Sequence, residues 1–266
     1  MLTSGLRHFL LALQFFTRVP VTGRLAQWVG FSPQMLRSSA AHFPGVGWMV
    51  GGVAAAVFAV AQTGLPGVAG AVVAALLSTI ATVLLTGAFH EDGLADVADG
   101  LGGSADRTRA LEIMKDSRIG AFGAIALVLA LGLKIALLAM LAGRGVEVAA
   151  CAIVSAHVLS RLAPLFLIRW LPYVGDSGAS KAKPLADAIG AGALWVGVAW
   201  SIPAAAPVLL AQGAVKTAAM VLACALAAAF MARLFRRRLQ GFTGDGLGAT
   251  QQVCELSIYL ALAWQA

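Results

Sequence analysis

Long apolar stretches separated by short polar segments run through the whole chain. Seven of them approach the roughly 20 residues that a helix needs to cross a bilayer; they cover residues 43–62, 67–88, 120–142, 148–170, 188–210, 215–232 and 249–265. The alternation of polar and apolar positions that a membrane β-barrel requires is absent. Because backbone amides in lipid must be paired within their own segment, these stretches predict helices. Gln251, Gln252 and Glu255 make the last stretch the least apolar.

The predicted fold is therefore all-α: a polytopic membrane helix bundle of about seven transmembrane helices, in a range of six to eight, forming a single integral membrane domain over residues 1–266. Leu6 to Phe16 predicts a helix that lies on the membrane surface or packs on the bundle. The Gly47 and Gly51 pair predicts a close helix contact.

Composition supports this fold class. The chain is 60% hydrophobic and 12% charged, about half the charged fraction of soluble domains. This balance excludes a water-soluble enzyme, a disordered protein, a coiled coil and a secreted disulfide scaffold. The three cysteines lie in apolar stretches and are interpreted as small core residues.

Basic residues collect in the segments that would lie on one side of the membrane, namely 1–42, 89–119, 171–187 and 233–248. These segments hold fourteen Lys and Arg residues: Arg7, Arg18, Arg24, Arg37, Arg107, Arg109, Lys115, Arg118, Lys181, Lys183, Arg233, Arg236, Arg237 and Arg238. The other side holds Arg144 and Lys216. By the positive-inside rule, residues 1–42, the 89–119 loop and the Gly-rich 233–248 loop are cytoplasmic, and the C-terminus is periplasmic. The net charge of +7 is thereby explained without a nucleic-acid partner.

Acidic residues concentrate between positions 89 and 119, which hold seven of the twelve. Asp92, Asp96 and Asp99 follow an i, i+4, i+7 spacing, so one helix would place them on one face. Carboxylates so close repel one another unless a cation lies among them. Hard oxygen ligands favour Mg²⁺ or Mn²⁺, which proteins often bind together with substrate phosphates. The alternative is a solvated acidic loop that caps a helix.

Further polar residues near these acids have two interpretations each. Gly93 and Gly100 would let backbone approach a ligand, or would simply form turns. Lys115 and Arg118 would hold phosphate, or would anchor the next span. Asp245, in a second Gly-rich stretch, would contact metal or a substrate hydroxyl, or would belong to a plain loop. The same alternatives of phosphate contact and surface anchoring apply to Arg18 and His42.

Within the spans, His157 and Arg161 share a helical face and either line the site or form a structural pair. Lys134 is interpreted as a packing or snorkelling residue.

Several of these segments resemble one known family. Phe89–Gly100, Met114–Gly120 and Gly241–Ala249, together with Phe15–Pro20 and Phe43–Gly47, closely resemble the cobalamin synthases, the adenosylcobinamide-GDP ribazoletransferases. The resemblance extends over essentially the whole chain. It implies a multi-pass protein of the bacterial inner membrane that joins adenosylcobinamide-GDP to α-ribazole or α-ribazole 5′-phosphate, releases GMP and requires Mg²⁺.

Roles for individual residues follow from this resemblance as expectations. Asp92, Asp96, Asp99 and Asp116 are expected to hold one or two Mg²⁺ ions. Lys115 and Arg118, with Arg18, Asp245 and the glycines Gly93 and Gly100, are expected to bind the substrates. A carboxylate or histidine is expected to take the proton of the ribazole hydroxyl, with Glu91 as first choice and His90 and Asp99 as the other candidates.

Two other functions remain as alternatives. The frame Asp92-Gly93-Leu94-Ala95 partly resembles that of the CDP-alcohol phosphotransferases, although the arginine after the alanine and the later pair of aspartates are missing. An ion- or proton-coupled transporter would instead place acids near the bilayer midplane and show repeat symmetry. The expected partners are the small-molecule substrates and membrane lipid. The sequence leaves open a homo-oligomer, the lower-ligand base and the choice between ribazole and its phosphate.

Overall fold

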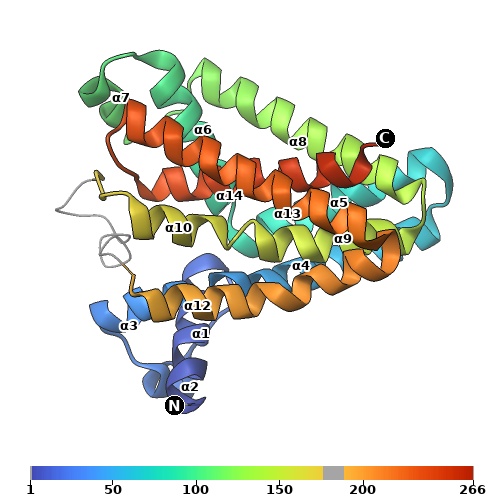
Figure 1. Cartoon of the computed structure of the whole chain (residues 1–266), viewed down its shortest axis with the longest axis horizontal. Coiled ribbons are helices and arrows are strands. Elements are labelled where there is room, and N and C mark those ends of the chain that lie inside the picture. Colours follow the sequence, from blue (N-terminus) through green and yellow to red (C-terminus); the bar gives the residue numbers. More distant parts are fainter. Residues whose placement is uncertain (1, 176–188, 266) are drawn as a thin grey trace.

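A computed structural model describes residues 2–175 and 189–265, and this part of the chain is built from helices (Figure 1). The helices are α1 (Leu2–Phe16), α2 (Gly23–Val29), α3 (Pro33–Ser39), α4 (Phe43–Gly64), α5 (Gly67–Thr86), α6 (Phe89–Gly103), α7 (Arg107–Ile113), α8 (Ala121–Ala142), α9 (Val146–Leu159), α10 (Ala163–Trp170), α12 (Ala191–Ser201), α13 (Ala205–Arg238) and α14 (Gly244–Ala263), with the 3₁₀ turns η1 (Ala40–His42) and η2 (Ile202–Ala204). The predicted all-α class is confirmed.

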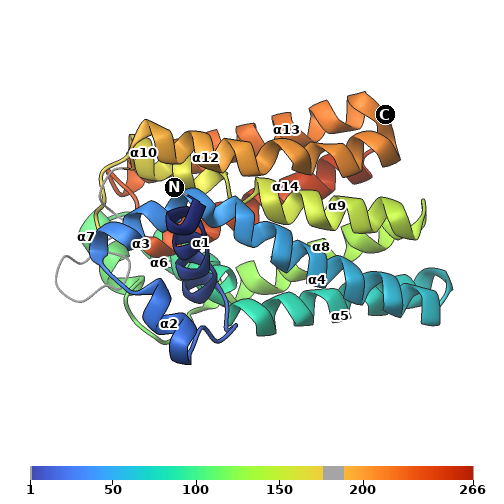
Figure 2. The ribbon, with the colours of Figure 1, turned by 90° about the horizontal axis from the view of Figure 1, so that it is seen from below.

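The long helices run side by side along the long axis of the molecule (Figures 1 and 2). α4 and α5 form a hairpin, α8 and α9 form another, and α10 continues the line of α9. α12 and the first part of α13 run toward the far end, where the chain turns back at Gly213, whose φ of 83° and ψ of 176° interrupt the helix. α14 then returns, so that the chain termini lie at opposite ends (Figure 1).

Five helical stretches of the described chain are long and apolar enough to cross a membrane: 33–64, 67–86, 121–142, 146–170 and 191–238. The last is 48 residues long and is divided at Gly213, which gives two passes. α14 is not among the five, so the hydropathy of the described helices does not support a span at 249–265, the least apolar of the seven predicted stretches. Other helices enclose most of α14, and even its polar residues Gln251, Gln252 and Glu255 are buried.

α9 and α10 form the centre of the bundle. In the apolar window of stretch 146–170, 78% of the residues are buried, against 22% in the window of α8. The outer helices turn large apolar side chains such as Leu84, Val128 and Phe230 outward. In a water-soluble protein this exposure would be costly, but it suits helices that face lipid.

α4 approaches α9 closely through the two glycines that the sequence paired. A Cβ atom on Gly47 would lie 2.4 Å from the carbonyl oxygen of His157, and one on Gly51 would lie 3.0 Å from the His157 Cβ. The expected small-residue contact is confirmed. It also brings the α4 backbone next to the polar residues of α9 described below.

Replacing Gly47 by alanine is expected to destabilise the bundle by about 1–3 kcal/mol, because the α9 backbone must move to relieve the clash. Gly52 on the same helix has open space around it, so Gly52→Ala is the matched control and should be neutral or stabilising by up to about 1 kcal/mol. Thermal unfolding in detergent compares the two variants. Equal midpoints would contradict the close α4–α9 contact.

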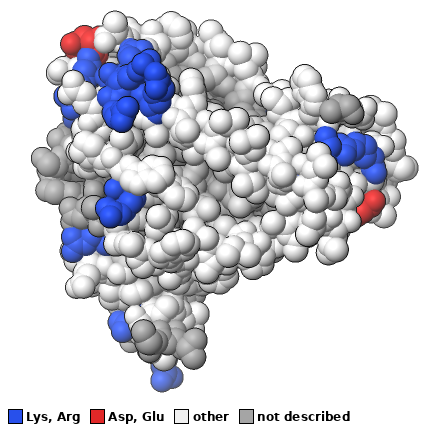
Figure 3. All heavy atoms as spheres, in the orientation of Figure 1, with Lys and Arg blue, Asp and Glu red and all other residues white. Residues whose placement is uncertain are grey.

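Basic side chains gather at one end of the molecule, with a second small group at the other (Figure 3). The first end carries α1 to α3, α6, α7 and the last turn of α13, which contains Arg236, Arg237 and Arg238. Arg144 follows α8 and Lys216 follows Gly213, at the opposite end. The predicted separation of the loops between two ends is therefore confirmed for the described residues; Lys181 and Lys183 lie outside them.

Two consecutive residues in the left-handed conformation separate α5 from α6. Gly87 has a φ of 69°, and Ala88, which lacks the freedom of glycine, has a φ of 59°. The helix predicted for 67–88 therefore ends at Thr86, and the acidic segment starts a helix of its own. The neighbouring backbone holds this break in place, because Arg18 N donates to the Leu85 oxygen at 2.7 Å.

Candidate functional site

Four aspartates lie where α6 approaches the first turn of α14. Asp92, Asp96 and Asp99 lie on one face of α6, and Asp245 comes from α14. Burial, followed by the charges of Asp245, Asp92 and Asp99, raises the pKa of Asp96 to about 7. Burial and the charge of Asp92 raise the pKa of Asp245 to about 6. Among the described residues, none of these causes is a positive charge, so within that part of the chain the acids form an uncompensated group that favours a cation.

Glycines allow the two helices to approach so closely. A Cβ on Gly93 would lie 2.7 Å from the backbone oxygen of Asp245, and one on Gly248 would lie 3.3 Å from the His90 Cα. At Gly100, the side chain of Met114 occupies the space that a Cβ would need. Both glycines make room for protein in this structure, and the approach of their backbone to a ligand stays a prediction.

Asp99 is turned toward the start of α8. Its two carboxylate oxygens accept hydrogen bonds from Gly120 N at 2.7 Å and Gly123 N at 2.8 Å. A Cβ on either glycine would lie within 2.4 Å of the carboxylate, so a larger residue at either position would displace the Asp99 side chain. Asp99 thus satisfies amides that the first turn of a helix leaves unpaired. These hydrogen bonds give Asp99 a structural role, and its expected roles as a metal ligand and as a proton acceptor stay predictions.

Replacing Asp99 by alanine is expected to lower the free energy of unfolding by about 2 kcal/mol, because a buried cap is lost. Asp106 caps the short exposed helix α7 through Arg109 N, and Asp106→Ala is the control with a smaller expected loss. Urea unfolding in detergent measures both. Unchanged stability together with abolished turnover would return Asp99 to the ligand group.

Asp116 and Arg118 pair with each other at the surface. Arg118 donates to both Asp116 oxygens at 2.6–3.2 Å, and these hydrogen bonds hold the pKa of Asp116 at about 2. Asp116 is not among the charges that act on Asp96, so the structure does not bring it into the acidic group. The side chain of Arg18 lies against Gly87, between α5 and α6. Phosphate binding by Lys115, Arg118 and Arg18 stays a prediction.

Glu91 and His90 point away from the aspartates into the protein. Glu91 is 7% exposed and its Oε1 accepts from Gln252 Nε2 at 3.1 Å, while its Oε2 has no hydrogen-bond partner among the described residues. His90 is stacked on Phe16 with 6.0 Å between ring centroids. Burial raises the pKa of Glu91 and lowers that of His90. This position argues against Glu91 as the proton acceptor, the role for which the sequence favoured it as first choice.

A buried polar network extends from Glu91 into the bundle, and sequence reasoning missed most of it. Glu255 lies at its centre: Lys134 Nζ is 2.7 Å from Oε1, and Gln251 Nε2 donates to Oε2 at 2.6 Å. Tyr259 also donates to Glu255, and His157 Nδ1 lies 3.5 Å from it. Lys134 is thus a buried ion-pair partner, which corrects its interpretation as a packing or snorkelling residue. The signal available in the sequence was an acid and a base inside two apolar stretches.

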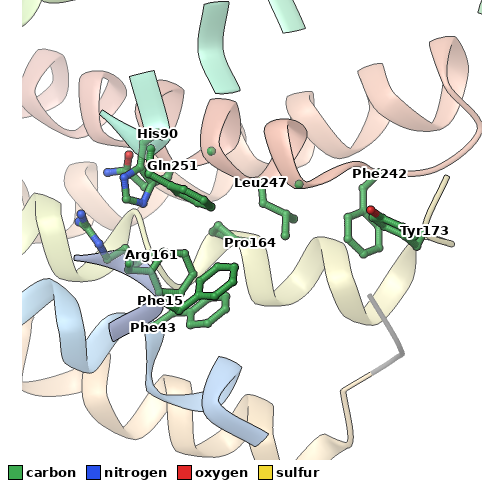
Figure 4. Close-up of a pocket in the computed structure, with 13 residues that line it drawn as sticks. Phe15, Phe43, His90, Arg161, Pro164, Tyr173, Phe242, Leu247 and Gln251 are labelled. Carbon is green, nitrogen blue, oxygen red and sulfur yellow. The ribbon is translucent and has the colours of Figure 1, made fainter. Parts of the chain in front are cut away.

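An aromatic pocket lies beside this network, between α1, α4, α6, α10 and α14 (Figure 4). Arg161, His90 and Gln251 line one end, and Tyr173 and Phe242 line the other. Hydrogen bonds from Val174 N to the Phe242 oxygen and from Phe242 N to the Pro172 oxygen, both 2.9 Å, fix the second end. Phe15, Phe16, Phe43 and Phe89 complete the walls. Of the residues expected to reach the site, Arg161 and His90 line this pocket.

Comparison with known proteins identifies the family. The model of the cobalamin-5-phosphate synthases matches residues 8–263. The chain belongs to this family. A relative from Albidiferax ferrireducens is 58% identical over 277 residues, which cover 98% of this chain and 99% of the relative. Relatives from Polaromonas naphthalenivorans and Shewanella amazonensis are 58% and 45% identical, over 97% of this chain and 98% and 95% of their own lengths. All three are named adenosylcobinamide-GDP ribazoletransferase. No solved structure matches the chain.

Membership of this family decides between the alternatives that the sequence left open. The three relatives are named as ribazoletransferases, and none is named as a lipid head-group transferase or a transporter. The arrangement of the acids agrees, since they lie together at one end of the bundle rather than at its middle. The resemblance noted for the motifs at 89–100, 114–120 and 241–249 is therefore confirmed.

Proposed function

We propose that the carboxylates at the crossing of α6 and α14 form the site of the reaction that the family performs. That reaction joins adenosylcobinamide-GDP to α-ribazole in cobalamin synthesis. The observation that supports this location is the uncompensated group of Asp92, Asp96 and Asp245. Reactions of diphosphates need positive charge near the phosphates, and this acidic group would recruit it.

The bonds that change define what this site must do. A hydroxyl oxygen of the ribazole attacks the phosphorus on the corrinoid side of the diphosphate, and a new P–O bond forms. The P–O bond to the departing GMP breaks, and GMP leaves with the electron pair. The hydroxyl proton passes to a base. We infer that this base is a carboxylate of the acidic group, because the Glu91 carboxylate lies in the interior and binds Gln252.

The donor set fits Mg²⁺, although the described residues contain no group of three side chains close enough to enclose an ion. Magnesium usually binds one or two carboxylates and completes its shell with water and substrate phosphates. Asp92, Asp96 and Asp245 would hold it, and Asp92 is exposed and accessible to substrate. When bound, the ion would neutralise charge on the diphosphate and on the departing GMP.

The test is an assay of purified protein with adenosylcobinamide-GDP, α-ribazole 5′-phosphate and Mg²⁺, followed by identification of the products by mass. We expect adenosylcobalamin 5′-phosphate and GMP in equal amounts. Chelation should stop turnover and added Mg²⁺ should restore it. Absence of product would overturn the proposed function, whereas turnover that is unaffected by chelation would overturn only the metal requirement.

We further propose that the chain lies in the bacterial inner membrane with its acidic end in the cytoplasm. The unequal distribution of basic residues between the two ends supports this orientation. A cysteine introduced at Ser104, which follows α6, should resist impermeant thiol reagents in intact cells. Labelling from outside would overturn the orientation.

A further inference from the structure

The buried arginine of the aromatic pocket has an incomplete set of partners. Arg161 is 4% exposed. Its NH1 group donates a hydrogen bond to the backbone oxygen of His157 at 2.8 Å and lies 3.1 Å from the Nδ1 atom of the same histidine. In the part of the chain that the structure describes, neither the Nε of Arg161 nor the Nε2 of His157 has a hydrogen-bond partner. The charges of Glu255 and Glu91 act on Arg161 without a direct ion pair, and Glu255 is already bound by Lys134 and Gln251. Within the described part of the chain, Arg161 forms no ion pair.

An unpaired guanidinium in a bundle interior is expensive, and such residues usually mark a functional site. Arg161 lines the pocket, so a ligand entering the pocket can supply the missing anion. Guanidinium groups bind phosphate through two parallel hydrogen bonds. The free Nε is a donor suited to this geometry. The chemistry of this end of the pocket therefore points to a phosphate group.

The rest of the pocket selects the molecule that carries the phosphate. Its walls are apolar and aromatic: the Phe16 and Phe43 rings meet edge to face at 4.2 Å, and Tyr173 and Phe242 are 5.5 Å apart. Guanine has amino and carbonyl groups on its edge that such walls would leave unpaired. The base of a ribazole is a benzimidazole, which has no such groups outside its ring. The walls therefore suit the acceptor better than the GDP moiety of the donor.

We propose that this pocket binds the acceptor as a nucleoside monophosphate, with its base along the aromatic walls and its phosphate at Arg161. The proposal rests on the proposed function and extends it, because it assigns Arg161 to the acceptor's phosphate and the aromatic walls to its base. The pocket borders the reaction site, since Gly244 and Gly248 line it on either side of Asp245 in the sequence.

The enclosed space of the pocket is about 30 Å³, enough for one or two water molecules. The base must therefore displace one wall of the pocket. The wall that contains Phe15 and Phe16 belongs to α1, which crosses the end of the bundle.

The first experiment compares two acceptors in Arg161→Gln and Arg161→Lys. With α-ribazole 5′-phosphate, we expect the KM of Arg161→Gln to rise at least thirtyfold. With α-ribazole, which lacks the phosphate, the KM should change less than threefold. Arg161→Lys keeps the charge but loses the paired geometry, so its KM should be intermediate. Equal losses with both acceptors, or no loss with either, would overturn the proposal.

A binding measurement on the wild-type protein tests the proposal even if the Arg161 variants do not fold. Equilibrium dialysis should show that α-ribazole 5′-phosphate binds at least tenfold more tightly than α-ribazole, and equal affinities would overturn the proposal. If wild-type protein yields no product at all, the proposed function fails. If it turns over but neither measurement distinguishes the acceptors, only the acceptor site fails.

The second experiment tests the aromatic wall with Phe242→Leu. We expect the KM for the acceptor to rise about tenfold and the KM for adenosylcobinamide-GDP to stay the same. Phe230→Leu is the matched control, because Phe230 is 60% exposed on the outer face of α13. A rise in the KM for adenosylcobinamide-GDP alone would show that the pocket holds the donor instead, and would overturn the assignment.

Discussion

Replacing Asp96 by asparagine is expected to lower turnover at least a hundredfold while the bundle stays folded. Asparagine keeps the size of the side chain and removes the charge that a divalent ion needs. Loss of groups that only support a metal ligand costs about 10–100-fold, so loss of a direct ligand should cost at least as much. Asp96 is half-buried among Asp245, Asp92 and Asp99. Removing its charge also relieves repulsion, so stability should not fall.

Initial rates at increasing Mg²⁺ concentration measure this effect, and thermal unfolding in detergent checks the fold. Glu112→Gln is the matched control, because Glu112 belongs to the same acidic segment but is exposed and paired with Arg109 at 3.0 Å. Its turnover should remain within twofold of wild type. If Asp96→Asn retains more than a tenth of wild-type turnover, Asp96 does not hold the ion.

Hydropathy predicted most helix bounds well, because the thickness of a bilayer sets the length of an apolar helix. The stretch predicted at 43–62 became α4 (Phe43–Gly64), and the one at 120–142 became α8 (Ala121–Ala142). The gap between the predicted stretches 188–210 and 215–232 also agrees with the turn at Gly213. The break at Gly87 and Ala88 was not predicted, because it depends on backbone angles and an apolar Ala88 shows no sign of a left-handed conformation in the sequence.

The acidic site was predicted in part. The spacing of Asp92 and Asp96 was enough to place them on one helical face, because it depends only on local geometry. Asp99 has the same periodicity, but its carboxylate binds amides that lie more than 20 residues later, at Gly120 and Gly123. Only the packing of α8 against α6 shows this role. Likewise, the pairing of Asp116 with Arg118 depends on a turn that the motif alone does not reveal.

The polar residues of α14 were visible in the sequence, but their meaning required the fold. Gln251, Gln252 and Glu255 lower the hydropathy of this stretch because α14 is surrounded by protein rather than lipid. Each of the three finds a partner there: Gln251 binds Ser160, Gln252 binds Glu91 and Glu255 binds Lys134. A helix in such a position can lose apolar character without cost, provided that its polar groups are paired.

Replacing Glu255 by glutamine is expected to lower the free energy of unfolding by about 3–5 kcal/mol, because it leaves Lys134 charged and buried without its partner. Lys134 is 3% and Glu255 1% exposed, so water cannot take over. Denaturant unfolding in detergent measures the loss. The turnover of Glu255→Gln should fall as well, because the same network connects through Gln251 and Gln252 to Glu91 behind the reaction site.

The double variant Lys134→Met, Glu255→Leu separates the ion pair from the rest of the network. Once both charges are removed, no isolated charge remains in the interior, and an apolar pair of similar volume is often as stable as the ion pair it replaces. We therefore expect the double variant to be more stable than Glu255→Gln alone, with an interaction energy of about 2 kcal/mol or more in the mutant cycle. Additive losses would show that Lys134 and Glu255 act independently. In that case the hydrogen bonds of Glu255 to Gln251 and Tyr259 would carry its contribution, and Lys134 would remain tolerable in the bundle without a carboxylate.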